Sequence, residues 1–261
     1  NTQTAMKMNR HVCRRIPLCL QNMGFNFRHC KLFHCNGVLF DQNAVTFENI
    51  LSEENKLRVL KALQKYDLPS LRKVTVAGDH RKAAVLIPLC SVKGEPSILF
   101  MVRSNKIPAH RGEVSFPGGM MDDTDHDLIT TALRETQEEI GLKIPREAVW
   151  GSLQSLPSRN GKTLVTPIIA SIGELQNHNL HLNKTEVERV FTRTISSLCD
   201  RKNVGSTQFK RGKLPSLKSG YTLPVYLGGE HRIWGLTAIT LHMLLPILAP
   251  GLYKFNLLHK N

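Results

Sequence analysis

The sequence predicts one mixed α/β domain that follows a basic N-terminal leader. Apolar runs typical of buried strands, at 83–89 and 98–102, alternate along the chain with segments of helical spacing. A content of 41% hydrophobic and 21% charged residues in 261 is ordinary for a folded domain with a sizeable core. The first 40 residues contain no acidic residue. We expect a leader over 1–50, a helix and connector over 51–82, the main domain over 83–252 and a tail over 253–261.

The leader carries much of the positive charge. Residues 1–40 hold six basic residues, which leaves 29 basic and 21 acidic residues, or +8, for the rest of the chain. Arg10, Arg14 and Arg15 alternate with apolar residues, as in a mitochondrial transit peptide. We therefore expect a mitochondrial protein whose leader is removed before about residue 50; a disordered basic arm is the alternative. The charge of the body favours a polyanionic partner such as a nucleotide, a phosphorylated cofactor or nucleic acid.

The cysteines follow the same division between leader and body. Four of the six lie in the leader, and Cys90 and Cys199 lie in the body. A secreted disulfide framework would concentrate its cysteines in the folded domain, so we expect free thiols and a reducing compartment. The His-Cys pairs at 29–30 and 34–35 do not have the spacing of a structural zinc site.

The elements of the body follow from residue spacing. Apolar residues recur at helical intervals after Ser52, and Pro69 marks the end of that helix. A turn at 93–96, which contains glycine and proline, joins the two strands already described. The later elements are strands at 165–172, 187–195 and 222–227 and a loop over 210–220.

The segment 236–248 is the richest apolar stretch of the chain. It is interrupted by His242 and Pro246, and it is shorter than the roughly 20 residues that a membrane-spanning helix needs. We predict that it forms a closing core helix and that the chain has no membrane span.

An acidic helix is predicted in the second half of the segment 118–142, which contains few helix-breaking residues. Asp125 or Thr124 is expected to cap its start, with Asp127 in the first turn. Gly141 suits the left-handed conformation that ends many helices.

Helical periodicity sets two glutamates of this helix at the edge of its apolar face. Glu135 and Glu139 fall at or inside that edge, and Glu138 falls outside it. Three acids at this spacing repel one another, and burying their charge is unfavourable unless it is neutralised. Arg134 can offset one charge, and the remaining carboxylate oxygens suit Mg²⁺ or Mn²⁺. The alternative is a solvated, salt-bridged helix face.

Two adjacent glycines, Gly118 and Gly119, follow Phe116-Pro117 shortly before this helix. Glycine lets the backbone approach a ligand closely, although a plain turn would also explain the pair. Together with the acidic helix, the glycines indicate a site for phosphate and metal.

In this segment the chain resembles the Nudix hydrolases. Their signature is Gly, five residues, Glu, seven residues, Arg-Glu, an aliphatic residue, any residue, Glu-Glu, any residue, Gly and an aliphatic residue. The matching positions are Arg134, Glu135, Glu138, Glu139, Gly141 and Leu142. The chain departs from the signature at Asp125, where the upstream Glu belongs, at Thr136, where an aliphatic residue belongs, and by one extra residue before Arg134.

The segment before the glycines is similar to the coenzyme A diphosphatase branch of that family. This branch carries roughly Leu-Leu-Thr-any-Arg-Ser, then Gly, then Phe-Pro-Gly-Gly. The matching positions are Leu99, Arg103, Ser104, Gly112 and 116–119, whereas Phe100, Met101 and Pro108 depart. The resemblance runs from about Ala83 to Ala238 and covers none of residues 1–50; within the branch it points to the animal mitochondrial member.

The resemblance implies the Nudix α/β/α sandwich with a mixed sheet, and the metal-dependent hydrolysis of a diphosphate. Glu135, Glu138 and Glu139 would hold Mg²⁺ or Mn²⁺, and Arg134 would mainly orient them. The proton of the attacking water would pass to Glu138 or to a loop acid such as Glu186. The branch implies coenzyme A (CoA) and acyl-CoA esters as small-molecule substrates, split into 3′,5′-ADP and 4′-phosphopantetheine or its acyl form.

Two glycines and three basic residues are the candidates for substrate binding. Gly118 and Gly119 would approach the diphosphate, and Arg103 and Arg111, with Lys106, could pair with the 3′-phosphate of CoA. Because Arg103 lies so close in sequence to the glycines, we expect it to contact the diphosphate instead.

Two other functions fit parts of the sequence. A Nudix enzyme for dinucleoside diphosphates or capped RNA would use the same acidic helix, but the upstream motif disfavours it. A catalytically silent module that binds CoA or RNA is disfavoured by the three glutamates. RNA binding from charge alone lacks aromatic residues, since the chain has two Trp and four Tyr.

Overall fold

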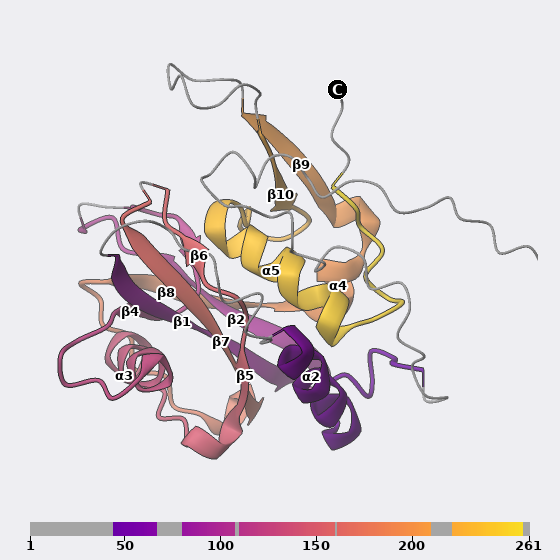
Figure 1. The fold of residues 1–261 in the computed structure, drawn as a ribbon, viewed down its shortest axis with the longest axis horizontal. Helices are drawn as coiled ribbons and strands as arrows, with labels where there is room; N and C mark the ends of the chain where they lie inside the picture. The colour runs from indigo at the N-terminus through magenta and orange to yellow at the C-terminus, as the bar shows by residue number, and fades with distance from the viewer. Residues whose placement is uncertain (1–43, 67–79, 108–109, 160, 210–220, 258–261) are drawn as a thin grey trace, which may run out of the picture.

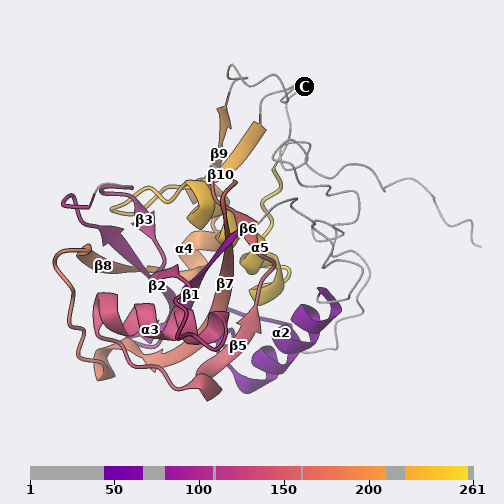
Figure 2. The ribbon, with the colours of Figure 1, turned by 60° about the vertical axis from the view of Figure 1, so that its left-hand side comes forward.

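A mixed β-sheet with helices on both faces forms the body (Figure 1), and a two-stranded ribbon projects from it (Figure 2). The computed structural model describes residues 44–66, 80–107, 110–159, 161–209 and 221–257. The strands are β1 (Arg81–Val92), β2 (Glu95–Arg103), β3 (Val114–Ser115), β4 (Gly118–Met120), β5 (Val149–Ser152), β6 (Leu156–Pro157), β7 (Thr163–Glu174), β8 (Val187–Thr194), β9 (Val204–Phe209) and β10 (Tyr221–Tyr226). The helices are α2 (Glu53–Tyr66), α3 (Leu128–Ile140), α4 (Ile195–Cys199) and α5 (Gly235–Leu248), with short 3₁₀ turns η3 (Arg146–Ala148), η4 (Leu175–Asn177) and η5 (Arg201–Asn203).

The main sheet has the order β3-β2-β1-β7-β5, and β8, β4 and β6 pair with β2, β1 and β7 respectively. β1 and β7 run parallel over most of their length, whereas the other pairs are antiparallel. A parallel pair needs a long crossover, and the chain between these strands supplies it with β2, β4, α3 and β5. The predicted α/β class with a mixed sheet is confirmed.

Alternate residues of β1 enter two separate apolar cores, as the period of a strand requires. Leu86 lies in the core beneath α3 with Ala132, whereas Ile87 lies in the core beneath α5 with Leu241. Both faces of β1 are therefore buried, which explains its continuous apolar run.

The helix α2 belongs to the folded body. Asn55 Nδ2 donates to Leu248 O (3.1 Å) and Arg58 Nη2 donates to Ile247 O (2.6 Å), so both side chains satisfy carbonyls at the end of α5. Just before α2, Ile50 is fully buried and Phe47 packs against the same core.

The short strand β4 fixes the glycines beside β1. Gly118 pairs with Val85 and Gly119 with Ala84, and the Leu86 amide donates to Pro117 O (2.8 Å). Because α3 follows almost directly, this pairing holds the loop and the acidic helix on the same side of the sheet.

The observed elements differ from the predicted ones at several ends and in five strands that were not predicted. The hairpin turn is confined to Lys93 and Gly94, whose φ angles are 53° and 82°, while Pro96 already lies in β2. Ile195, expected to end a strand, begins α4 after Thr194 caps it. Strands β3, β4, β5, β6 and β9 were not predicted. Pro69, the loop over 210–220 and residues 1–43 of the leader lie outside the described residues.

The free thiols predicted for the body are observed. Cys90 and Cys199 are free and buried, and burial raises the pKa of each thiol to about 12. Across the described ranges, no helix is long and apolar enough to cross a membrane.

Candidate active site

The cap of the acidic helix α3 lies two residues after Asp125, the nearer of the two predicted caps. Asp127, expected in the first turn, is the cap, and it accepts a hydrogen bond from the Thr130 amide (2.8 Å). The predicted caps are wrong because Asp125 is engaged elsewhere, with Arg134, and Thr124 hydrogen-bonds to Asp122. At the other end, Gly141 has φ 73°, as predicted.

Glu139 is the most deeply buried acid of the helix. Its side chain is 3% exposed, and its Oε2 accepts a hydrogen bond from the Gly118 amide (2.8 Å). Arg103 Nη1 lies 3.9 Å from Oε1, too far for a hydrogen bond but close enough to offset charge. Burial outweighs both contacts and raises the pKa of Glu139 to about 8. With a pKa of about 8, this carboxyl group needs a further cation nearby to be fully charged at neutral pH.

Glu135 occupies space that only a glycine leaves free. A Cβ atom on Gly119 would lie 2.5 Å from the carboxyl carbon of Glu135, whose side chain is 18% exposed. Burial also raises the pKa of Glu135, and the nearby charges of Glu138 and Glu186 add to the effect. The glycine pair therefore makes contact with both carboxylates.

Arg134 connects the remaining acids. Its Nη1 donates to Glu135 and to Glu138 (3.0 Å each), while Nε and Nη2 donate to the two oxygens of Asp125 (3.0 and 2.9 Å). This pairing lowers the pKa of Asp125 to about 2. An arginine that contacts three carboxylates orients them, which agrees with the structural role expected for Arg134.

Thr136 lies at the buried centre of the helix face. Its Oγ1 donates to Ala132 O (2.6 Å), which satisfies the hydroxyl without a partner from another element. The departure from the aliphatic pattern at this position is therefore tolerated by the core.

Glu186 approaches the helix from the segment before β8. Its charge raises the pKa of both Glu135 and Glu139, and its backbone oxygen accepts a hydrogen bond from the Ser104 amide (2.8 Å). The structure thus brings Arg103 and Glu186 together with the three helix glutamates.

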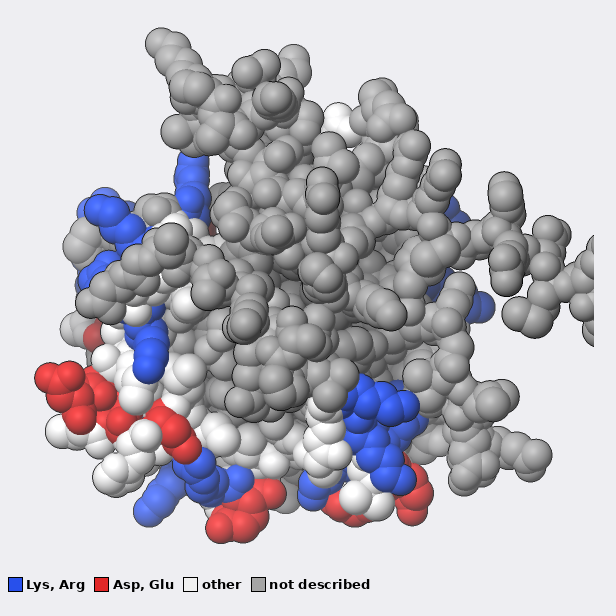
Figure 3. Space-filling view, viewed as in Figure 1, with Lys and Arg blue, Asp and Glu red and all other residues white. Residues whose placement is uncertain are grey.

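Arg111 and Lys106 are not part of this group. Both are exposed, and Arg111 Nε donates to Ile107 O (2.8 Å) within its own loop. Figure 3 shows basic side chains at the upper left, over the end of the sheet, and acidic ones below them. A role for Arg111 and Lys106 in binding the 3′-phosphate stays a prediction.

The donors at this site fit a divalent cation. As the side chains stand, Arg134 engages Glu135 and Glu138, and the described ranges contain no cluster of three His, Cys, Asp or Glu positioned to hold a metal. Nevertheless, two carboxylates with raised pKa converge here, and hard oxygen donors are what Mg²⁺ and Mn²⁺ prefer. A bound cation would supply the missing positive charge.

The sequence did not reveal that the loop between η4 and β8 contacts the end of α3. The His181 amide donates to Ile140 O and the Asn183 amide to Glu139 O (2.9 Å each), so this loop closes the end of the helix. The only local signal was Asn183 followed by Thr185, a pattern typical of a turn stabilised by an asparagine side chain.

Comparison with known proteins gives consistent matches. The NUDIX domain family matches residues 80–205. The chain is 48% identical over 176 residues to the mitochondrial coenzyme A diphosphatase NUDT8 of Mus musculus, covering 67% of this chain and 81% of the mouse protein. The Homo sapiens protein of the same name is 46% identical over 173 residues, covering 66% and 71%. Nudix hydrolase 3 of Caenorhabditis elegans is 38% identical over 218 residues, covering 80% and 90%.

Proposed function

The chain belongs to the Nudix hydrolase family, and we propose that it hydrolyses the diphosphate of CoA and acyl-CoA esters. The products would be 3′,5′-ADP and 4′-phosphopantetheine or its acyl form. The observation that carries this proposal is the 48% identity to a protein named as a coenzyme A diphosphatase, over 81% of that protein. The buried carboxylates beside the glycine loop support the same reaction.

Glu135, Glu138 and Glu139 would hold the cation. When bound, Mg²⁺ or Mn²⁺ offsets the charge of the diphosphate oxygens and makes a water molecule more acidic. The residues of the chain prepare this site: the Gly118 amide fixes the Glu139 carboxylate, and Arg134 fixes Glu135 from the other side. A site oriented in advance needs little rearrangement during the reaction.

Hydrolysis requires an acceptor for the proton of water. The water oxygen bonds to one phosphorus, the P–O–P bridge breaks, and the bridging oxygen leaves with the other phosphate. We assign the proton to Glu186 rather than Glu138, because Glu138 is paired with Arg134 and its side chain is 56% exposed. Glu186 lies close enough to Glu135 and Glu139 to raise the pKa of both.

Product analysis tests the proposal directly. We expect purified protein to convert CoA and several acyl-CoAs to 3′,5′-ADP only with Mg²⁺ or Mn²⁺, and to act more slowly on NADH and capped RNA. Faster turnover of NADH or capped RNA would favour the nucleotide-directed alternative. Binding without turnover at any metal concentration would favour the silent binding module.

Arg103 is expected to bind the diphosphate, since its guanidinium lies beside Glu139. Arg103→Ala should lose about 1.5–3 kcal/mol of transition-state binding, the usual range for a charged hydrogen bond. The loss in kcat/KM should be equal for CoA and dephospho-CoA. Arg201→Ala, at an exposed arginine in η5, is the control and should keep the wild-type kcat/KM. A loss at Arg103 confined to CoA would assign this arginine to the 3′-phosphate instead.

We propose a mitochondrial location and a processed leader. Cleavage should occur before residue 44, because Val45 and Phe47 pack against the core and Ile50 is fully buried. Mass spectrometry of the N-terminus recovered from mitochondria would identify the cleavage site. A full-length fusion that stays cytosolic and uncleaved would contradict this, and replacing Arg10, Arg14 and Arg15 with Glu is the control that should abolish import.

A further inference from the structure

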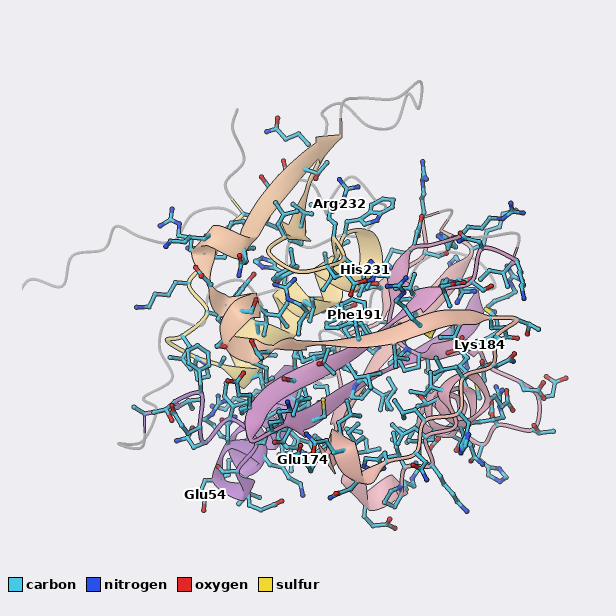
Figure 4. The ribbon with its side chains drawn as sticks, turned by 180° about the vertical axis from the view of Figure 1, so that it is seen from behind. Glu54, Glu174, Lys184, Phe191, His231 and Arg232 are labelled. Atoms are coloured by element: carbon cyan, nitrogen blue, oxygen red, sulfur yellow. The ribbon has the colours of Figure 1, made fainter. Side chains whose placement is uncertain are left out.

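The loop over 181–187 is attached at both ends to the proposed catalytic elements. At its start, the His181 and Asn183 amides donate to Ile140 O and Glu139 O in the last turn of α3 (2.9 Å each). At its end, Glu186 O accepts from the Ser104 amide (2.8 Å), next to Arg103. Figure 4 labels Lys184, which marks this loop beside α3.

Asn183 holds most of the hydrogen bonds within this loop. Its backbone oxygen accepts from the amides of Glu186 (3.0 Å) and Val187 (2.8 Å). Its side-chain Oδ1 accepts from the amide (3.2 Å) and the hydroxyl (2.6 Å) of Thr185. This is a turn closed by an asparagine side chain, and it leaves few conformations to the residues that follow.

The same asparagine connects two acids of the site. Its backbone amide donates to the backbone oxygen of Glu139, whose carboxylate accepts a hydrogen bond from Gly118. Its backbone oxygen accepts from the backbone amide of Glu186. The route from one acid to the other therefore passes through a single residue. Lys184 does not contribute to this connection, since its Nζ donates to Glu188 O (3.2 Å), on the far side of Glu186 in the chain.

We propose that Asn183 is a positioning residue, which fixes the distance between the Glu186 carboxylate and the carboxylates of Glu135 and Glu139. This inference rests on the proposed function, because it gives Glu186 the proton of the attacking water. The Asn183 side chain acts through the turn that it closes with Thr185, and this turn sets the path of the backbone at Glu186.

A double-mutant cycle tests the inference, with kcat and KM measured for CoA at saturating Mg²⁺. Glu186→Gln should lower kcat about a hundredfold, as loss of a general base does. Asn183→Ala should lower kcat about tenfold with KM unchanged, because a small displacement of a reacting group slows chemistry more than binding. The double variant should be no slower than Glu186→Gln alone, because without the carboxylate there is nothing left to position. Asn177→Ala, an exposed asparagine in η4, should behave as wild type.

Two results would overturn the inference. One is a double variant slower by the product of the two single effects, which is expected if Asn183 only stabilises the fold. The other is a Glu186→Gln variant with normal kcat. If Asn183→Ala does not fold, Thr185→Ala removes the hydroxyl half of the same turn, and the same cycle applies. Turnover of CoA by the wild type tests the proposed function separately, since Asn183 enters only through ratios between variants.

Discussion

Glu139→Gln is expected to lower kcat/KM for CoA by about three orders of magnitude at saturating Mg²⁺, while the fold is retained. The amide keeps the shape of the side chain and can still accept the hydrogen bond from Gly118. It removes the charge that would hold the cation at the most buried position of the site. Glu147→Gln, an exposed glutamate in η3, is the control and should be fully active. Near-normal turnover by Glu139→Gln would remove Glu139 from the set of metal ligands.

The same variant should be more stable than wild type when metal is absent. Burial raises the pKa of Glu139 from about 4.5 in the unfolded chain to about 8, so the folded state binds its proton more tightly. The contribution of Glu139 to the free energy of unfolding is fully present below pH 4.5, where the carboxyl group is protonated in both states. This contribution is lost as the pH rises through 8. We expect Glu139→Gln to gain a few kcal/mol over wild type at pH 8, given about 1.4 kcal/mol per unit of pKa shift.

Chemical denaturation with and without Mg²⁺ at pH 5 and pH 8 measures this effect. In EDTA the advantage of Glu139→Gln should be present at pH 8 and much smaller at pH 5. Added Mg²⁺ should stabilise wild type and not the variant, because a ligand that binds only the folded state adds to its stability. Equal stability of the two proteins in EDTA at pH 8 would mean that Glu139 is not strained by its burial.

Periodicity along α3 was sufficient to predict which acids face the core: Glu139 is buried and Glu135 is half-buried. Glu135 and Glu139 share the helix face that holds Ala132, and the helical repeat alone sets this relation. The left-handed Gly141 was also predictable, because few other residues adopt that conformation at a helix end. Such features depend only on neighbours in sequence.

Contacts between distant segments were beyond the reach of the sequence. Asp125 was predicted to cap the helix, and only the fold reveals that Arg134, nine residues later, takes both of its oxygens. Glu186 reaches Glu139 through a loop whose path depends on backbone hydrogen bonds to α3. Residue types carry little information about such bonds, since every amide can donate one.

The two glycines also show what the sequence could not predict. The Gly-Gly motif marked both positions as important but did not distinguish their roles. Gly118 has φ 145°, and a Cβ there would overlap the Ala84 carbonyl oxygen and lie 2.5 Å from Val85 Cα. That obstacle is backbone, which can move only if β4 separates from β1. Gly118→Ala is therefore expected to destabilise the protein by about 3 kcal/mol or more, through strain and the loss of strand pairing.

Gly119→Ala should give the opposite result: a folded protein with little activity. The atoms that its Cβ would meet belong to the carboxylate of Glu135, the free end of a flexible side chain that can swing away. Movement of this carboxylate leaves the core intact but displaces a proposed metal ligand, so kcat/KM for CoA should fall about a hundredfold. Denaturation midpoints and turnover, measured side by side for the two alanine variants, separate the roles. A fully active Gly119→Ala protein would show that displacement of Glu135 does not affect the reaction, and Glu135 could not then be a direct ligand of the metal.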